Sequence, residues 1–209
     1  MNETVNPEWW RKSLQGPLPG VNAQLKMAPT FRGSFPDQEE AMRAAVLALL
    51  YPSGGGARLV FIKRNEYDGP HSAQVSFPGG AWEEGDHSLE ETALRETREE
   101  LGVSGSIEIL GPLTPLHIPV SNFIVHPFLG WLPEAPLYDP DPSEVQYVIE
   151  ASVSELLNPV NRESETIRHH GRTIEAPFYR VGKEKIWGAT AMMLSELLQL
   201  TGRLSSHPG

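Results

Sequence analysis

Short apolar runs separated by polar and glycine-rich turns dominate the chain, and they predict β-strands. The longest clear run, residues 44–50, is continuously apolar and has the length of a buried strand. Similar but shorter or less regular runs predict further strands at residues 59–62, 75–77, 107–110, 123–132, 145–149 and 173–180.

Helical spacing of apolar residues predicts two main helices. One runs from Thr92 to Leu101 and ends at Gly102, because a helix C-terminus favours a residue that tolerates positive φ. The other covers residues 187–200 near the end of the chain. Two shorter helices are predicted at residues 7–14, with Asn6 as N-cap, and at residues 153–157.

Strands arranged around two main helices predict an α/β fold with a mixed β-sheet between helical layers. A length of 209 residues fits one domain with an extra segment. We expect the domain at residues 41–203. An N-terminal arm, residues 1–40, would combine a short helix with an irregular segment, and residues 204–209 would form a flexible tail.

Composition narrows the classes of partner. The formal net charge of −10 argues against nucleic acid or an anionic membrane as a partner, because either would require a basic face. Cysteine is absent, which excludes a disulfide framework and a thiolate zinc site. The first residues lack a signal-peptide pattern, and no apolar stretch approaches the ~18 residues of a membrane span. We therefore expect a cytoplasmic protein.

Three carboxylates share one face of the predicted helix that ends at Gly102. Glu96, Glu99 and Glu100 are spaced i, i+3 and i+4, and like charges at these spacings repel by roughly 0.2–0.5 kcal/mol per pair. A divalent cation would relieve this repulsion, and hard oxygen ligands favour Mg²⁺ or Mn²⁺. The alternative is an ordinary solvated helix face with interleaved arginines.

The surrounding residues favour the metal site, because they resemble the Nudix box, G-x5-E-x7-R-E-U-x-E-E-x-G-U with U a bulky aliphatic residue. The matching residues are Gly80, Arg95, Glu96, Glu99, Glu100, Gly102 and Val103. The chain departs from the pattern in three ways. Asp86 replaces the first glutamate, eight residues rather than seven separate it from Arg95, and Thr97 replaces an aliphatic residue. The first two departures, with Phe-Pro-Gly-Gly ahead of the box, resemble the coenzyme A pyrophosphatase branch.

The resemblance implies an α/β/α sandwich and an enzyme that hydrolyses a nucleoside diphosphate linked to another group. It implies Mg²⁺ or Mn²⁺ held by Glu96, Glu99, Glu100 and the carbonyl of Gly80, with Arg95 orienting a box glutamate. The general base would be a box glutamate or an acid from a later loop, for which Glu144 is the candidate. Glu83 or Asp86 would reach a second metal through water, and His71 would lie beside phosphates. The remaining histidines show no metal-ligand spacing.

The substrate stays open between two enzymatic hypotheses and one non-catalytic hypothesis. The coenzyme A branch has an upstream pattern in which Arg64 and the Phe-Pro-Gly-Gly turn align with identical spacing, but Gly69 replaces an arginine suited to the 3′-phosphate. Lys63 or Arg64 would then take over that role. The alternatives are ADP-ribose or a nucleotide sugar as substrate, or a non-catalytic nucleotide-binding module. A homodimer is compatible with the two adjacent tryptophans of the arm.

Overall fold

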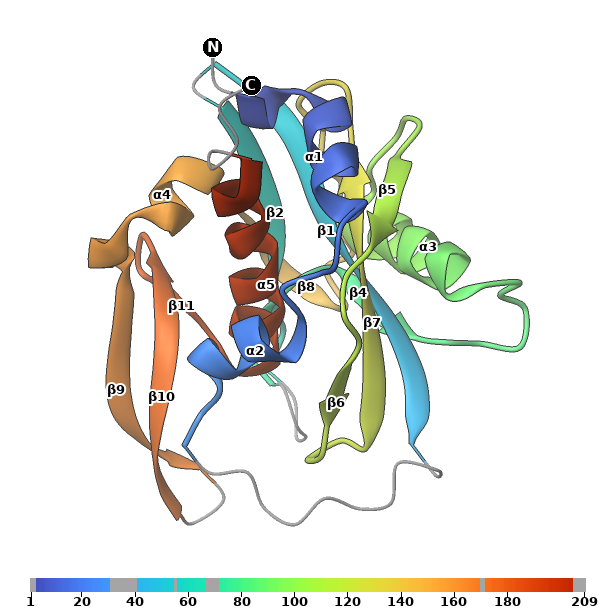
Figure 1. Ribbon diagram of the computed structural model, residues 1–209. Helices are drawn as coiled ribbons and strands as arrows, with labels where there is room; N and C mark the ends of the chain where they lie inside the picture. Colours follow the sequence, from blue (N-terminus) through green and yellow to red (C-terminus); the bar gives the residue numbers. More distant parts are fainter. Residues whose placement is uncertain (1–2, 31–40, 55, 67–71, 170–171, 205–209) are drawn as a thin grey trace.

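A mixed eight-stranded sheet forms the centre of the molecule (Figure 1). The computed structural model describes residues 3–30, 41–54, 56–66, 72–169 and 172–204. Strands β3, β2, β1, β7 and β5 lie in this order, with β4 beside β1, β6 beside β7 and β8 beside β2. Among the described residues, β1 and β7 form the one parallel pair of this sheet, and the other pairs are antiparallel. The strands are β1 (Met42–Ser53), β2 (Gly56–Arg64), β3 (Val75–Ser76), β4 (Gly79–Ala81), β5 (Glu108–Pro112), β6 (Leu116–Ile118), β7 (Phe123–Trp131) and β8 (Val145–Ser152).

Helices cover both faces of this sheet, so the predicted α/β sandwich is confirmed. Successive side chains of β2 point to opposite faces. Phe61 joins the core under α5 (Gly188–Leu204), whereas Val60 and Ile62 join the core under α3 (Leu89–Leu101). Figure 1 shows α3 on one side of the sheet and α5, with the N-terminal helices, on the other. No helix within the described ranges is long and apolar enough to cross a membrane.

Strands β1 and β2 separate along their length, and this separation creates room for the candidate site. They pair near their hairpin, where Leu50 lies opposite Leu59. Further along, β4 pairs with β1 and β3 pairs with β2, so the segment 75–81 lies between the two diverging strands. The sequence did not predict β4, because Gly79–Ala81 contains no apolar alternation. Its place in the sheet depends on pairing with β1.

A second, three-stranded sheet was only partly predicted. It contains β9 (Arg162–His169), β10 (Arg172–Val181) and β11 (Glu184–Trp187), with β10 in the middle. Strand β10 matches the predicted strand at 173–180. Strand β9 escaped prediction because it is rich in charged and polar residues, which pair with neighbouring strands through contacts such as Arg180–Glu163. The C-terminal helix was predicted to begin at Trp187. It begins one residue later, at Gly188, because Trp187 is the last residue of β11.

The described part of the N-terminal arm packs into the same core as the domain. Helix α1 (Pro7–Leu14) has the predicted bounds, and the side chain of Asn6 accepts a hydrogen bond from the Glu8 backbone N–H. Trp10 is fully buried, and its indole N–H donates to the Thr4 carbonyl at 2.9 Å. The expectation of an irregular segment was wrong for residues 20–27, which form α2 (Gly20–Gln24) and a 3-10 helix (Leu25–Met27).

A buried carboxylate ties this arm to the C-terminal helix. Glu196 of α5 is fully buried and accepts hydrogen bonds from the Gly20 N–H, the Gln24 side-chain amide and the Thr114 hydroxyl. The short helix α4 (Val153–Leu157) agrees with its prediction. Helix α5 reaches Leu204, one residue into the predicted tail, and residues 205–209 lie outside the described ranges.

Candidate functional site

Local signals set both ends of helix α3, which carries the three clustered glutamates. The hydroxyl of Ser88 accepts a hydrogen bond from the Glu91 N–H at 3.1 Å, which caps the first turn. Gly102 ends the helix in the left-handed region, with φ of 62°. Thr97, which stands where the box pattern has an aliphatic residue, is buried and satisfies its hydroxyl by donating to the Ala93 carbonyl. The substitution therefore leaves no unpaired polar group in the core.

Asp86 and Arg95 fix the loop that precedes α3. Arg95 donates to both carboxylate oxygens of Asp86, from Nε at 2.9 Å and from Nη2 at 3.0 Å. Thr92 Oγ1 and the Glu83 N–H also donate to Asp86. The Arg95 hydrogen bond, together with the other donors, holds the pKa of Asp86 well below its ordinary value despite burial. These contacts show that Asp86 holds the loop together, and a contact of Asp86 or Glu83 with a second metal through water stays a prediction.

Arg95 also contacts the metal-ligand candidates, although its two-pronged partner is Asp86 and not the expected box glutamate. Its Nη1 donates to Glu96 Oε1 at 2.9 Å and to Glu99 Oε2 at 3.0 Å. One cationic nitrogen therefore bridges two of the three carboxylates. This contact shows that the space between Glu96 and Glu99 suits positive charge.

Gly80 lies directly against the carboxylate of Glu96. A Cβ atom added to Gly80 would stand 2.4 Å from the Glu96 carboxyl carbon, closer than any real contact. A side chain at this position would therefore displace the carboxylate of Glu96. Burial raises the pKa of Glu96 above its ordinary value, in spite of the Arg95 hydrogen bond.

Glu100 is the most deeply buried of the three carboxylates. Its Oε2 accepts a hydrogen bond from the Gly79 N–H at 2.8 Å, and its Oε1 accepts a longer one from Arg64 Nη1 at 3.3 Å. The side chain is 1% exposed, and burial raises its pKa to about 8. Two polar contacts thus leave this charge incompletely compensated.

The donor set suits a hard divalent cation, but the side chains are not arranged around one. Within the described ranges, no group of three acidic or histidine side chains is placed to hold a metal ion. Glu99 is 60% exposed and turned to Arg95, while Glu100 is turned to Gly79. The glutamates occupy one helical face beside Gly80, and their oxygens are ligands that Mg²⁺ and Mn²⁺ accept.

Glu144 comes from the turn before β8 and lies close enough to Glu96 and Glu100 for its charge to affect both carboxyls. Its side chain is exposed. Burial is the main cause of the raised pKa of Glu96 and Glu100, and the negative charge of Glu144 contributes to both shifts. The structure therefore brings this later acid, which is separated from α3 by more than 40 residues in sequence, to the same region.

Of the three residues expected to bind substrate, the structure places one at this site. Arg64 contacts Glu100 on the α3 face of the sheet. Lys63 points to the opposite face, where its ammonium pairs with Glu184 at 2.8 Å, because adjacent strand residues alternate. Lys63 therefore lies away from the box carboxylates, and its contact with substrate stays a prediction. His71 and Gly69 lie outside the described residues.

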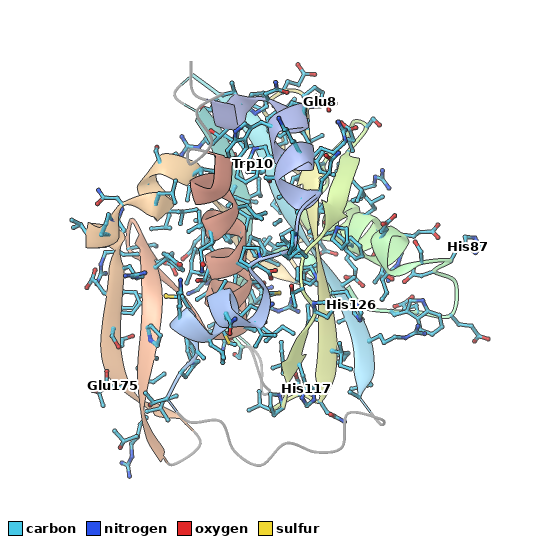
Figure 2. All side chains as sticks on the ribbon, viewed as in Figure 1. Glu8, Trp10, His87, His117, His126 and Glu175 are labelled. Carbon is cyan, nitrogen blue, oxygen red and sulfur yellow. The ribbon has the colours of Figure 1, made fainter. Side chains whose placement is uncertain are left out.

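The histidines that the structure describes do not form a cluster. Figure 2 shows His87, His117 and His126 apart from one another on the α3 side and on the sheet. Burial lowers the pKa of His126, and the nearby charge of Arg43 adds to this effect.

Two hollows adjoin Arg64. The apolar pocket, of about 330 Å³, is bounded by Gly79, Gly80 and apolar side chains of the sheet and of α5, among them Val46, Phe77, Phe123 and Met193. The polar pocket is a more open hollow of about 610 Å³, lined by Arg64, Asn65, Glu66, Ser143, Glu144 and Gln146. Arg64, Gly80 and Glu144 were predicted as site residues. The other lining residues were not, because the apolar ones look like ordinary core and the polar ones like ordinary loop.

Comparison with known proteins agrees with this geometry. The family model described as NUDIX domain matches residues 41–170. The human mitochondrial coenzyme A diphosphatase NUDT8 is 31% identical over 186 residues, which cover 88% of this chain and 74% of that protein. The uncharacterized Nudix hydrolase NudL of Pectobacterium atrosepticum is 29% identical over 187 residues, covering 86% of this chain and 92% of that protein.

Solved structures show the same fold. A MutT/nudix family protein from Enterococcus faecalis superposes with a TM-score of 0.54 at 19% sequence identity. The superposition covers 84% of this chain and 68% of that chain. At this level of identity the similarity concerns the fold alone.

Proposed function

Because the chain belongs to the Nudix family and is a hydrolase of pyrophosphate bonds, we propose that it is a metal-dependent coenzyme A diphosphatase. Its products would be 4′-phosphopantetheine and adenosine 3′,5′-bisphosphate. The spacing from Arg64 to the Phe-Pro-Gly-Gly turn supports this substrate, as does the similarity to NUDT8. Coenzyme A derivatives such as acetyl-coenzyme A belong to the same proposal.

The observation that carries the proposal is the apolar pocket beside Gly79 and Gly80. A diphosphate bound at the box carboxylates would have one organic arm adjacent to this pocket. Apolar walls with few polar groups suit an uncharged arm, such as the pantetheine chain or a nucleobase. Arg64 borders the same pocket and offers a guanidinium to phosphate oxygens.

The residues that would hold Mg²⁺ or Mn²⁺ are Glu96, Glu99, Glu100 and the Gly80 carbonyl. When bound, the ion supplies charge neutralisation on the phosphates and lowers the pKa of water. Glu144 would accept a proton from the attacking water, and Glu99 is the alternative base. The water oxygen forms a bond to one phosphorus, the bridging P–O bond breaks, and the departing phosphate keeps the electron pair.

Arg95 would position this machinery without touching the substrate. Its Nε and Nη2 are committed to Asp86, while Nη1 reaches Glu96 and Glu99. The Arg95 guanidinium thus ties Glu96 and Glu99 to Asp86, in the loop that follows β4. Orientation of a charged side chain by a two-pronged guanidinium contact is a common use of arginine.

The polar pocket favours the second candidate, ADP-ribose or a nucleotide sugar. Glu66 and Glu144 place two carboxylates in this pocket beside Asn65 and Gln146. Such a lining suits sugar hydroxyls, and it repels an additional phosphate. Lys63, the other cation considered for the 3′-phosphate, is engaged with Glu184. The non-catalytic module is not proposed, because the chain is a hydrolase.

A substrate panel separates the two candidates. We would measure kcat/KM with Mg²⁺ or Mn²⁺ for coenzyme A, dephospho-coenzyme A, acetyl-coenzyme A, ADP-ribose and UDP-sugars, with EDTA as control and products resolved by ion-exchange chromatography. The proposal predicts that coenzyme A and acetyl-coenzyme A exceed dephospho-coenzyme A. It also predicts that Arg64→Ala reduces this preference. A higher kcat/KM for ADP-ribose or a UDP-sugar would contradict the coenzyme A assignment.

The binding partners of the protein and its location in the cell stay predictions. A small nucleotide is the substrate class of the family. The cytoplasmic location, the homodimer and the lack of a nucleic-acid partner rest on the sequence.

A further inference from the structure

We infer that Asp141 and Asn65 are positioning residues that hold the backbone of Glu144 beside the box carboxylates. This inference rests on the proposed function, in which Glu144 accepts the proton of the attacking water. It concerns two residues outside the Nudix box.

Asp141 organises the turn that carries Glu144. Its Oδ1 accepts hydrogen bonds from both the N–H and the hydroxyl of Ser143, each at 2.7 Å. Its carbonyl accepts from the N–H of Glu144 at 3.1 Å and from the N–H of Val145 at 2.9 Å. Prolines at positions 140 and 142 flank it and restrict the backbone further. The peptide of Glu144 is therefore fixed although its side chain is exposed.

The same turn is anchored to the end of the box helix. The N–H of Asp141 donates to the carbonyl of Glu100 at 3.2 Å, and the N–H of Asp139 donates to the carbonyl of Leu101 at 3.0 Å. These carbonyls belong to the last turn of α3, where no helical partner is available. The backbone of a metal-ligand candidate and the turn of the proposed base are thus joined through one residue, Asp141.

Asn65 holds the turn from the other side, at the end of β2. Its backbone N–H donates to the Glu144 carbonyl at 3.1 Å, and its side-chain amide donates to the Pro142 carbonyl at 2.9 Å. The second of these contacts depends on the side-chain amide, which a smaller residue such as alanine would lack. Asn65 directly follows Arg64, so this clamp also fixes Glu144 relative to the guanidinium that contacts Glu100.

These contacts define what Asp141 and Asn65 contribute. The Glu144 carboxylate shares the polar pocket with Arg64, so it faces the region where a diphosphate would bind. A general base contributes about 10² to 10⁴-fold to a rate only when it lies within hydrogen-bonding reach of the proton it removes. A displacement of about 1 Å can cost on the order of 10²-fold. The hydrogen bonds that Asp141 and Asn65 make to this turn supply the required precision.

The test is a double-mutant cycle with Glu144→Gln, measured on the diphosphate that the wild type cleaves fastest. We expect Asp141→Ala to lower kcat by about 10²-fold with KM little changed. Asp141→Asn, which keeps the Oδ1 acceptor, should restore most of the rate. In the Glu144→Gln background, Asp141→Ala should have no further effect, because Asp141 acts through Glu144.

Two further variants keep the test decisive. Asn65→Ala removes the amide contact and keeps the backbone hydrogen bond, and it should also lower kcat. This variant carries the test if Asp141→Ala fails to fold. Asn158→Ala removes a comparable turn contact, to the Val160 N–H, away from the site and should leave kcat unchanged. Thermal unfolding and Mn²⁺ affinity, measured by calorimetry, would be recorded for every variant.

The inference is overturned if Asp141→Ala costs as much in the Glu144→Gln background as in the wild type. It is also overturned if Asp141→Ala or Asn65→Ala lowers only the unfolding temperature, or if Glu144→Gln alone turns over like the wild type. These outcomes leave the diphosphatase activity standing. Preference for ADP-ribose would instead contradict the proposed substrate and leave this inference intact.

Discussion

The buried carboxylate of Glu100 accepts a hydrogen bond from the backbone N–H of Gly79, at 2.8 Å between Oε2 and N. This contact joins the box helix to the glycine turn that enters it. Burial disfavours the charged form of Glu100 and raises its pKa to about 8, although the Gly79 hydrogen bond favours that form. The metal-free protein therefore buries a carboxyl at the centre of its candidate site without fully compensating its charge.

Metal-free protein should lose stability as the pH rises. A carboxyl whose pKa is higher in the folded state contributes stability that is fully present below its unfolded pKa and is lost as the pH rises through about 8. In EDTA, this contribution to the free energy of unfolding of the wild type should fall between about pH 4.5, the ordinary pKa of the carboxyl, and about pH 8, its folded value. Glu100→Gln should flatten this decline, because an amide does not titrate. Urea denaturation at several pH values measures the free energy of unfolding of the wild type and of Glu100→Gln.

Glu134→Gln serves as the control for that experiment, because Glu134 is an exposed carboxylate in a loop. Its pH dependence should match the wild type. An equally steep decline in Glu100→Gln would show that another group causes the loss.

The glycines of the box loop should respond differently to alanine. In Gly80→Ala the new Cβ would meet the carboxylate of Glu96, the far end of a flexible side chain, at 2.4 Å. The fold should survive while Glu96 moves, so kcat should fall by about 10²-fold. In Gly79→Ala the Cβ would lie 2.3 Å from the Ala45 carbonyl, and φ is 147°, so stability itself should fall. Steady-state kinetics and thermal unfolding separate these effects.

Gly85→Ala is the matched control in the same loop, because nothing lies within 4 Å of its Cβ position. Its kinetics and unfolding temperature should match the wild type. Normal turnover in Gly80→Ala would mean that the position of Glu96 is unimportant.

The Asp86–Arg95 pair should contribute stability that acid removes. The pKa of Asp86 is lowered by the Arg95 hydrogen bond, so its contribution is present above the unfolded pKa, near 4, and is lost as the pH falls towards the lower folded value. Asp86→Asn should lower the free energy of unfolding at neutral pH by about 1–3 kcal/mol, less than for a fully buried pair because Arg95 is partly exposed. The difference from the wild type should shrink as the pH is lowered, as urea denaturation would show. A constant difference across that range would contradict the assigned cause.

Sequence predicted helix α3 well because its signals are local. The carboxylate spacing, the apolar stripe and Gly102 all lie within one segment, and the structure places the helix at Leu89–Leu101. The continuous apolar run in β1 was equally informative. Strand β9 escaped because its charges pair with neighbouring strands, which no pattern within β9 records.

The parts of the site that were missed depend on tertiary contacts. The side of the sheet to which Lys63 points follows from the register of β2 against its neighbours. The engagement of Asp86 by Arg95 and the clamp of Asn65 on the Glu144 turn likewise join separate segments. One sequence without a structure gives the identity of these residues but not their partners.

The central claim is that the box carboxylates hold the metal on which hydrolysis depends. The most direct measurement compares turnover of the preferred diphosphate by the wild type, Glu99→Gln and Glu100→Gln, with Mg²⁺ and with EDTA, while circular dichroism confirms folding. Our account predicts that each variant loses orders of magnitude in kcat, because one metal contributes several kcal/mol of charge stabilisation. Turnover like the wild type in both folded variants would contradict it.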